Sequence, residues 1–108
     1  MTVATITEEQ VEAVRALVAS VPPGMITTYG DIASAAGLSS ARTVGWIMRT
    51  DTSDLPWHRV ITASGKPAPH LAARQLALLR AEGVLAHDGR VPVREYRRTL
   101  RSPSVNSE

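Results

Sequence analysis

The stretch MITTYGDIASAAGLSSARTVGWIMR, residues 25–49, decides the fold of this chain. Thr28 precedes a helical pattern over 29–36, and its hydroxyl is suited to cap the first turn of that helix. Gly37 then ends the helix, because glycine readily takes the left-handed conformation that closes helices.

A second helix follows after a very short turn. Ser39 or Ser40 supplies its cap, and the pattern continues to about Arg49. Two helices joined by a short turn that contains glycine are the plan of a helix-turn-helix unit. The sequence therefore predicts a nucleic-acid-binding element here.

The second helix has two different faces at the helical spacing of about 100° per residue. Val44, Ile47 and Met48 cluster on one side, which we expect to face the core. The opposite side carries two arginines, an aromatic residue and a glycine, and no acid: Arg42, Gly45, Trp46 and Arg49. This composition favours a surface pressed against nucleic acid over one that faces solvent.

Further elements are predicted on both sides of this unit. Residues 5–21 read as a helix, in which Thr7 and Gln10 form a capping box. A strand is expected over 59–62 and a third long helix over 71–82. The inner side of that helix is expected to carry Leu71, Ala72, Ala73, Ala77, Leu78 and Leu79.

A hairpin is expected near the end of the chain. Residues 84–86 and 91–93 flank the turn dipeptide Asp88-Gly89, which is a strong hairpin signal. A hairpin that follows a helix-turn-helix unit predicts a wing.

Composition narrows the functional classes. The 108 residues fit one domain, and the absence of cysteine excludes disulfides, thiolate metal sites and cysteine nucleophiles. The first ten residues do not resemble a signal peptide, and no apolar run has the length of a membrane span, so we expect a cytoplasmic protein. The spacing of the three histidines argues against a metal site, and no cofactor is expected.

A tryptophan and a histidine stand side by side in LPWHRVITASG, residues 55–65. Indole offers an apolar face and one N–H donor, so Trp57 is suited to line a pocket and not to act as a nucleophile. An ordinary core position for Trp57 remains the alternative. His58 is expected to hold the loop by hydrogen bonds.

Together, VPPGMITTYGDIASAAG, ARTVGWIMR and LPWHRVITASG resemble the DNA-binding domain of the O6-alkylguanine-DNA alkyltransferases over residues 7–84. Those enzymes carry a Pro-Cys-His-Arg-Val motif whose cysteine irreversibly takes the alkyl group from the damaged base. Trp57 stands at the cysteine position here, so the pattern is similar to that of the alkyltransferase-like proteins, which keep the domain and lose the nucleophile. No counterpart of the enzymes' N-terminal domain is expected.

The resemblance implies a role for several residues. Arg42 matches the finger arginine that fills the gap left by a flipped nucleotide, and Tyr29 matches the tyrosine that helps to rotate the nucleotide out. Gly45 would allow close approach to the minor groove, and Thr28 would contact phosphate. The expected lesion pocket comprises Tyr29, Trp57, His58, Val60, Ser64 and His70, and the expected DNA-binding residues are Thr28, Tyr29, Arg42, Thr43, Gly45, Trp46 and Arg49.

The chain also departs from the alkyltransferase pattern. Asp51 falls near the family's asparagine, and the glycine-rich loop is absent after Lys66. We expect no counterpart of the glutamate that completes the enzymes' Cys-His-Glu relay. In some alkyltransferase-like proteins a basic residue lies over the damaged base, and His70 or Lys66 is the nearest candidate.

We therefore expect an α/β, mainly α, winged helix-turn-helix domain over residues 1–101, followed by a flexible tail over 102–108. It would bind duplex DNA as a monomer through the minor groove, flip O6-alkylguanine into a pocket at Trp57 without chemistry, and direct the lesion to nucleotide excision repair. Two alternatives stay open. One is a winged-helix regulator without lesion preference, and the other is a hydrolase that uses His58 with Asp51 or Asp54.

Overall fold

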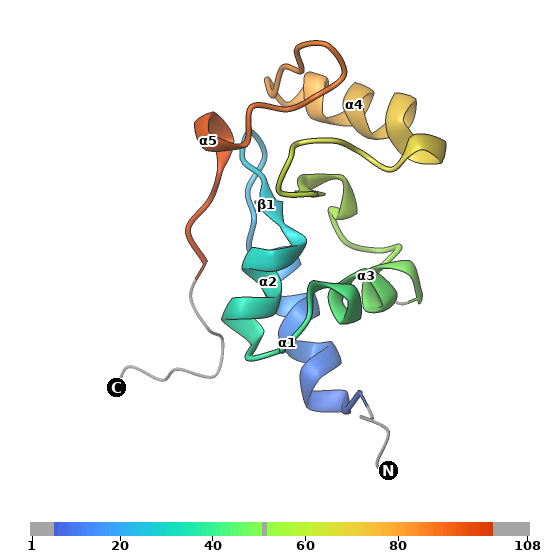
Figure 1. Cartoon of the computed structure of the whole chain (residues 1–108), viewed down its shortest axis with the longest axis vertical. Helices are drawn as coiled ribbons and strands as arrows, with labels where there is room; N and C mark the ends of the chain where they lie inside the picture. The colour runs from blue at the N-terminus through green and yellow to red at the C-terminus, as the bar shows by residue number, and fades with distance from the viewer. Residues whose placement is uncertain (1–5, 51, 101–108) are drawn as a thin grey trace.

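The computed structural model describes residues 6–50 and 52–100, so the expected tail over 102–108 lies outside the described residues (Figure 1). The elements are α1 (Glu8–Ala19), β1 (Thr27–Thr28), α2 (Tyr29–Ala36), α3 (Ala41–Thr50), the 3₁₀ helix η1 (Trp57–Arg59), β2 (Val60–Ile61), the 3₁₀ helix η2 (Pro69–Leu71), α4 (Ala72–Ala81) and α5 (Val93–Tyr96). None of the helices in the described ranges is both long and apolar enough to span a bilayer.

The capping box predicted for the first helix is present. The Thr7 hydroxyl accepts from the Gln10 backbone N–H at 3.1 Å, and the Gln10 side chain accepts from the Thr7 backbone N–H at 3.0 Å. Val14 and Val18 on the inner face of α1 are fully buried. Helix α1 is therefore packed on the core through residues that the periodicity indicated.

The helix-turn-helix unit of α2 and α3 confirms the prediction. Thr28 caps α2 by accepting from the Asp31 N–H at 3.0 Å, and Gly37 ends it in the left-handed conformation, with φ 73°. The Ser40 hydroxyl accepts from the Arg42 N–H at 3.1 Å at the start of α3. Local capping chemistry thus fixes the turn between the two helices.

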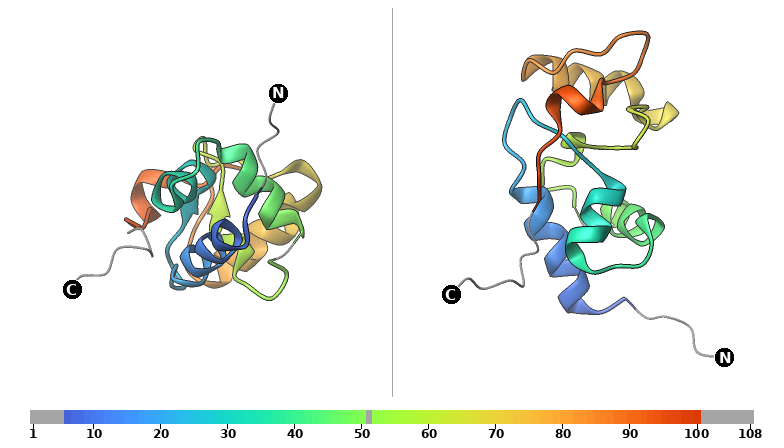
Figure 2. Two further views of the ribbon diagram at one scale, coloured as in Figure 1. Left: turned by 90° about the horizontal axis from the view of Figure 1, so that it is seen from below. Right: turned by 60° about the vertical axis from the view of Figure 1, so that its left-hand side comes forward.

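A short parallel strand pair separates two apolar clusters. β1 and β2 place Thr27 opposite Val60 and Thr28 opposite Ile61. Val60 belongs to the cluster built from α1, α2 and α3, whereas Ile61 belongs to a second cluster with Ile26, Leu79, Val84 and Val91. Because successive strand residues point to opposite faces, β2 joins both clusters. Figures 1 and 2 show α1–α3 at one end of the molecule and α4 and α5 at the other.

The inner face of α4 differs from the expectation. Leu79 is fully buried as predicted, but three residues expected on the inner side are exposed: Ala73, Ala77 and Leu78. Gln75 takes the inner position at 4% exposure, because its amide donates to the backbone oxygens of His58 at 3.0 Å and Val60 at 2.9 Å. Apolar periodicity cannot reveal a buried amide whose partners are distant carbonyls.

The expected two-stranded wing is reduced to a single turn. His87 and Arg90 exchange two backbone hydrogen bonds of 2.7 and 3.0 Å across Asp88-Gly89. The flanking residues do not extend this pairing. Val91 donates its N–H to the Gly65 oxygen at 2.8 Å instead, and 93–96 forms α5. The prediction of strands over 84–86 and 91–93 is therefore wrong. The residues that would extend the hairpin form hydrogen bonds and packing contacts with other segments instead.

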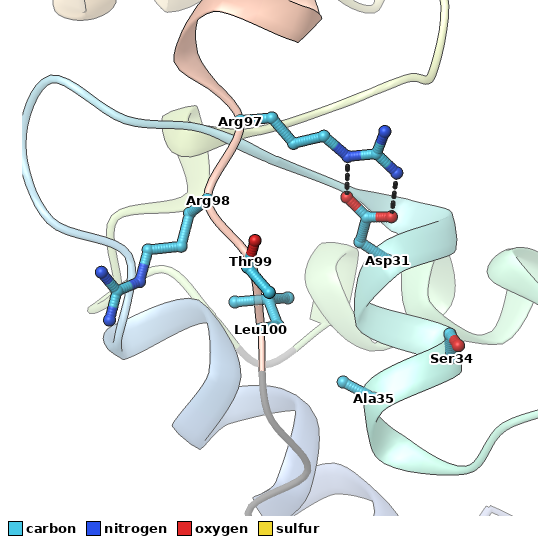
Figure 3. Close-up of a pocket in the computed structure, with 7 residues that line it drawn as sticks. All are labelled: Asp31, Ser34, Ala35, Arg97, Arg98, Thr99 and Leu100. Atoms are coloured by element: carbon cyan, nitrogen blue, oxygen red, sulfur yellow. Dashed lines mark hydrogen bonds and ion pairs between the residues drawn. The ribbon is translucent and has the colours of Figure 1, made fainter.

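The segment after α5 returns to the helix-turn-helix unit. Ile26 donates to the Tyr96 oxygen at 2.9 Å, and Arg98 donates its backbone N–H to the Ile26 oxygen at 2.8 Å. Arg97 binds Asp31 of α2 through two contacts, whereas the Arg98 side chain points away from this pair (Figure 3). The Arg97 hydrogen bonds hold the pKa of Asp31 below its usual range. Asp31 and Arg97 line a hollow of about 380 Å³, together with Arg98.

Candidate nucleic-acid interface and pocket

The outer face of α3 carries the arginines predicted to contact DNA. Val44 and Ile47 are fully buried, which leaves Arg42 and Arg49 exposed on the other side of the helix. Within the part of the chain that the structure describes, neither arginine forms an ion pair. Their positive charge is therefore free to meet phosphate.

An aromatic ring and open backbone complete this face. Trp46 is 49% exposed, which is uncommon for the largest apolar side chain. A Cβ added at Gly45 would meet nothing within 4 Å, so a partner can approach the backbone closely there. Both features suit contact with a nucleic acid surface.

Trp57 and His58 occupy η1, the turn that leads into β2. The Val60 N–H donates to the Trp57 oxygen and closes the turn. The two rings meet edge to face, with centroids 6.0 Å apart and planes at 85°. Trp57 lines the cavity described below, whereas His58 points to the end of α4. The two neighbouring side chains therefore lie in different environments, Trp57 at the cavity and His58 against the end of α4.

Glu82, directly after α4, binds both residues that follow Trp57. Its carboxylate accepts from Arg59 Nε at 3.0 Å and Nη2 at 2.6 Å, and lies 2.8 Å from His58 Nε2. Hydrogen bonds from Arg59 and then His58 outweigh burial and lower the pKa of Glu82 to about 2. The expectation that His58 lacks a glutamate partner is wrong. A separation of 24 residues hides this contact in the sequence.

A cavity of about 750 Å³ lies between α3, η1 and the start of α4. It is lined by Tyr29, Arg42, Gly45, Trp46, Met48, Arg49, Thr50, Thr52, Ser53, Trp57, Ala68, His70, Leu71 and Arg74. The predicted site residues among them are Tyr29, Arg42, Gly45, Trp46, Arg49, Trp57 and His70. The fold therefore brings predicted residues from four separate segments together around one cavity.

The other predicted site residues do not line this cavity: Thr28, Thr43, His58, Val60 and Ser64. Thr28 is 2% exposed and uses its hydroxyl to cap α2, and Val60 is fully buried in the core. Ser64 lies in an exposed turn with its hydroxyl 3.1 Å from Thr62 Oγ1. The proposed binding roles of these residues stay predictions.

Tyr29 enters the cavity from the first turn of α2. Its side chain is half-buried, and burial raises the pKa of the phenol above its usual value. The hydroxyl therefore stays protonated at neutral pH and can donate a hydrogen bond to an oxygen of a ligand.

Sequence reasoning missed part of the lining, above all Arg74. The Arg74 guanidinium carbon lies 5.5 Å from the centroid of the Trp57 ring, within the range of a cation–π contact. The available signal was the position of Arg74 in the first turn of the predicted helix, four residues after the pocket candidate His70. Met48 was predicted as core, and it is half-buried at the edge of the cavity.

The pairing of His58 with Asp54 that was considered for a hydrolase is not present. Asp54 accepts two hydrogen bonds from Arg15, at 3.1 and 2.8 Å, while the carboxylate at His58 belongs to Glu82. Asp51, the other candidate, lies outside the described residues. Over 6–50 and 52–100, no group of three His, Asp or Glu side chains could hold a metal ion.

Comparison with known proteins relates this chain to a family. Residues 9–84 match the family model described as the 6-O-methylguanine DNA methyltransferase, DNA binding domain. A protein of Escherichia coli named DNA base-flipping protein is 41% identical over 88 residues, which span 75% of this chain and 67% of that protein.

Two solved structures show the same fold. Schizosaccharomyces pombe Atl1, in complex with damaged DNA containing O6-carboxymethylguanine, matches with a TM-score of 0.78 and 30% identity over 87% of this chain and 98% of Atl1. Mycobacterium tuberculosis O6-methylguanine methyltransferase matches with a TM-score of 0.61 and 33% identity over 76% of this chain and 52% of that chain. The mainly helical fold, with its helix-turn-helix, is thus confirmed. The chain belongs to the family of the 6-O-methylguanine DNA methyltransferase DNA-binding domain, as the resemblance to alkyltransferase-like proteins predicted.

Proposed function

We propose that this chain is a non-enzymatic sensor of alkylated DNA, which binds duplex DNA through α3 and holds an extruded O6-alkylguanine at Trp57. One observation carries the proposal: a single cavity of about 750 Å³ joins the exposed arginine face of α3 to Trp57. A base that leaves the duplex under α3 would therefore enter the pocket directly. The volume lies within the range of roughly 300–1,000 Å³ that is usual for small-molecule sites.

The chemistry at position 57 supports binding without reaction. Alkyl transfer in this family needs a thiolate, and the chain contains no cysteine. Indole provides an apolar face and one donor, and it cannot take a methyl group in a comparable displacement. The bound lesion therefore keeps its alkyl group, and no reaction converts the complex to a product.

Three cavity residues have properties suited to base extrusion. Moving a base out of the stack costs a few kcal/mol. The planar guanidinium of Arg42 can enter the gap and stack there, and the open backbone at Gly45 allows α3 to approach the minor groove. Tyr29 lines the same cavity, and its protonated hydroxyl can donate a hydrogen bond to a backbone phosphate.

The relatives support the same function. The Escherichia coli relative is named for base flipping, and Atl1 was solved with DNA that carries an O6-alkylated guanine. Because a lesion held at Trp57 is marked and not repaired, we propose that this chain acts as a cytoplasmic monomer that passes the lesion to nucleotide excision repair.

The first test is fluorescence anisotropy of two labelled duplexes that differ only in guanine or O6-methylguanine at one site. We expect at least about tenfold tighter binding of the lesion, or 1.4 kcal/mol. Trp57→Ala should reduce this preference, because it removes the surface that contacts the alkyl group. Arg80→Gln, on the exposed side of α4, is the matched control and should keep it.

Equal binding of both duplexes by the wild-type chain would overturn the proposal. The winged-helix regulator without lesion preference would then be the better description. In that case affinity should depend on base sequence and not on alkylation.

A further inference from the structure

The charges around the cavity are one-sided. Three arginines line it, Arg42, Arg49 and Arg74, and no carboxylate lines it among the described residues. Arg42 and Arg49 lie on α3, where DNA phosphates would neutralise them. Arg74 comes from α4, on the wall beside Trp57, so phosphate binding by α3 leaves its charge unmatched.

The Arg74 side chain packs against the Trp57 indole and does not pair with an acidic side chain among the described residues. Its guanidinium carbon lies 5.5 Å from the Trp57 ring centroid. Among the described residues, two carboxylates of neighbouring segments are engaged elsewhere, Glu82 with His58 and Arg59 and Asp54 with Arg15. Over the described ranges Arg74 forms no ion pair. A cation in this position is available to a ligand.

The same position determines what Arg74 would meet. If a substituent on O6 of a guanine held in the cavity contacted the Trp57 ring, its outer end would lie near the Arg74 guanidinium, because the two side chains line the same cavity with the guanidinium carbon 5.5 Å from the ring centroid. A guanidinium binds a carboxylate through two parallel, charge-assisted hydrogen bonds. A methyl group offers no acceptor, and a neutral amide of the same size offers one acceptor without charge.

We propose that Arg74 is a specificity-determining residue that makes this pocket favour O6-substituents bearing a carboxylate over neutral substituents of equal size. The inference rests on the proposed function, because it names the lesion class that the same pocket prefers. It concerns the α4 wall and is independent of how α3 contacts the phosphates.

The test uses four duplexes that are identical except at one guanine. That guanine is unmodified, or carries an O6-methyl, an O6-carboxymethyl or an O6-carbamoylmethyl group. The last two have nearly the same shape and differ by one negative charge. We expect the wild-type chain to bind the carboxymethyl duplex at least about tenfold more tightly than the carbamoylmethyl duplex. Since the phosphates are the same, their contribution cancels in this ratio.

Two variants of Arg74 then assign the effect. Arg74→Gln should bring the ratio to within about twofold of one, and Arg74→Lys should keep part of it, because the charge remains without the bidentate geometry. Arg80→Gln removes the same charge from the same helix outside the cavity and should keep the wild-type ratio. Thermal unfolding of each variant checks that the fold is unchanged, as expected for exposed side chains.

A wild-type ratio near one, or a tenfold ratio that survives in Arg74→Gln, would overturn the inference. The O6-methyl duplex separates this result from failure of the proposed function. Preference for O6-methylguanine over guanine with a ratio near one rejects only the role of Arg74. No preference among all four duplexes rejects both proposals.

Discussion

Changing Glu82 to glutamine tests whether the carboxylate behind Trp57 stabilises the fold. The substitution keeps the size of the side chain and removes its charge. It replaces the carboxylate that accepts from Arg59 Nε and Nη2 with a neutral amide. Arg59, whose side chain is 14% exposed, keeps its hydrogen bond to the Val21 carbonyl but loses its anionic partner. An uncompensated charge in such surroundings is costly, so we expect the variant to be less stable.

The size of the effect follows from the pKa of Glu82, which falls from its usual value of 4.5 to about 2 in the folded chain. At 1.36 kcal/mol per pKa unit, this shift corresponds to roughly 3 kcal/mol of stability at neutral pH. Because the folded-state pKa is lowered, the contribution is fully present above about pH 4.5 and is lost as the pH falls towards 2.

Urea unfolding followed by circular dichroism measures this difference. Near pH 7, Glu82→Gln should lose about 3 kcal/mol, and the gap to the wild type should close as the pH falls from about 4.5 to about 2.5. Asp31 and Asp54 also titrate at low pH, but they do so in both proteins and cancel. Glu95→Gln, at an exposed position of α5, is the control and should match the wild type. A loss below about 1 kcal/mol near neutral pH, or a gap that stays constant on acidification, would refute the reasoning.

Gly65→Ala should lose at least about 2 kcal/mol in thermal or urea unfolding, because its Cβ would lie 2.0 Å from the Val91 oxygen. Gly83→Ala also has a positive φ but meets nothing within 4 Å, so a loss as large as that of Gly65→Ala would contradict the clash argument. Gln75→Leu should cost about 2–4 kcal/mol in urea unfolding, since it leaves two backbone carbonyls without their donor. Arg42→Ala should abolish base extrusion, read from a fluorescent base analogue at the lesion site, and keep weak, salt-sensitive binding; extrusion at the wild-type level would reject the finger role.

The helix-turn-helix could be predicted because every signal that defines it is local. The Thr28 cap and the Gly37 stop act within one or two turns of the residues that reveal them. The faces of α3 follow from a period that one helix imposes on its own residues, and Val44 and Ile47 are buried as expected. The outer face of α3, which lines the cavity, could therefore be predicted from the sequence.

The supports of Trp57 could not be predicted in this way. Glu82 is one acidic residue at a helix end, and only the fold brings it beside His58 and Arg59. Gln75 reads as a polar residue on a solvent face, although it donates two buried hydrogen bonds. The prediction of a wing was wrong for a related reason. Asp88-Gly89 forms the local turn, but the Val91 N–H donates to Gly65 in another segment.

The neighbours Trp57 and His58 have different roles in one short turn. His58 and Arg59 converge on Glu82, and Gln75 binds the backbone around them, so these residues position the turn against α4. None of these contacts involves the Trp57 side chain. These polar contacts, which present position 57 to the cavity, therefore do not require a particular side chain there. A thiol at such a position can react as a nucleophile, whereas an indole offers only an apolar face and one N–H donor, which agrees with the proposed role of Trp57 in binding a lesion without reaction.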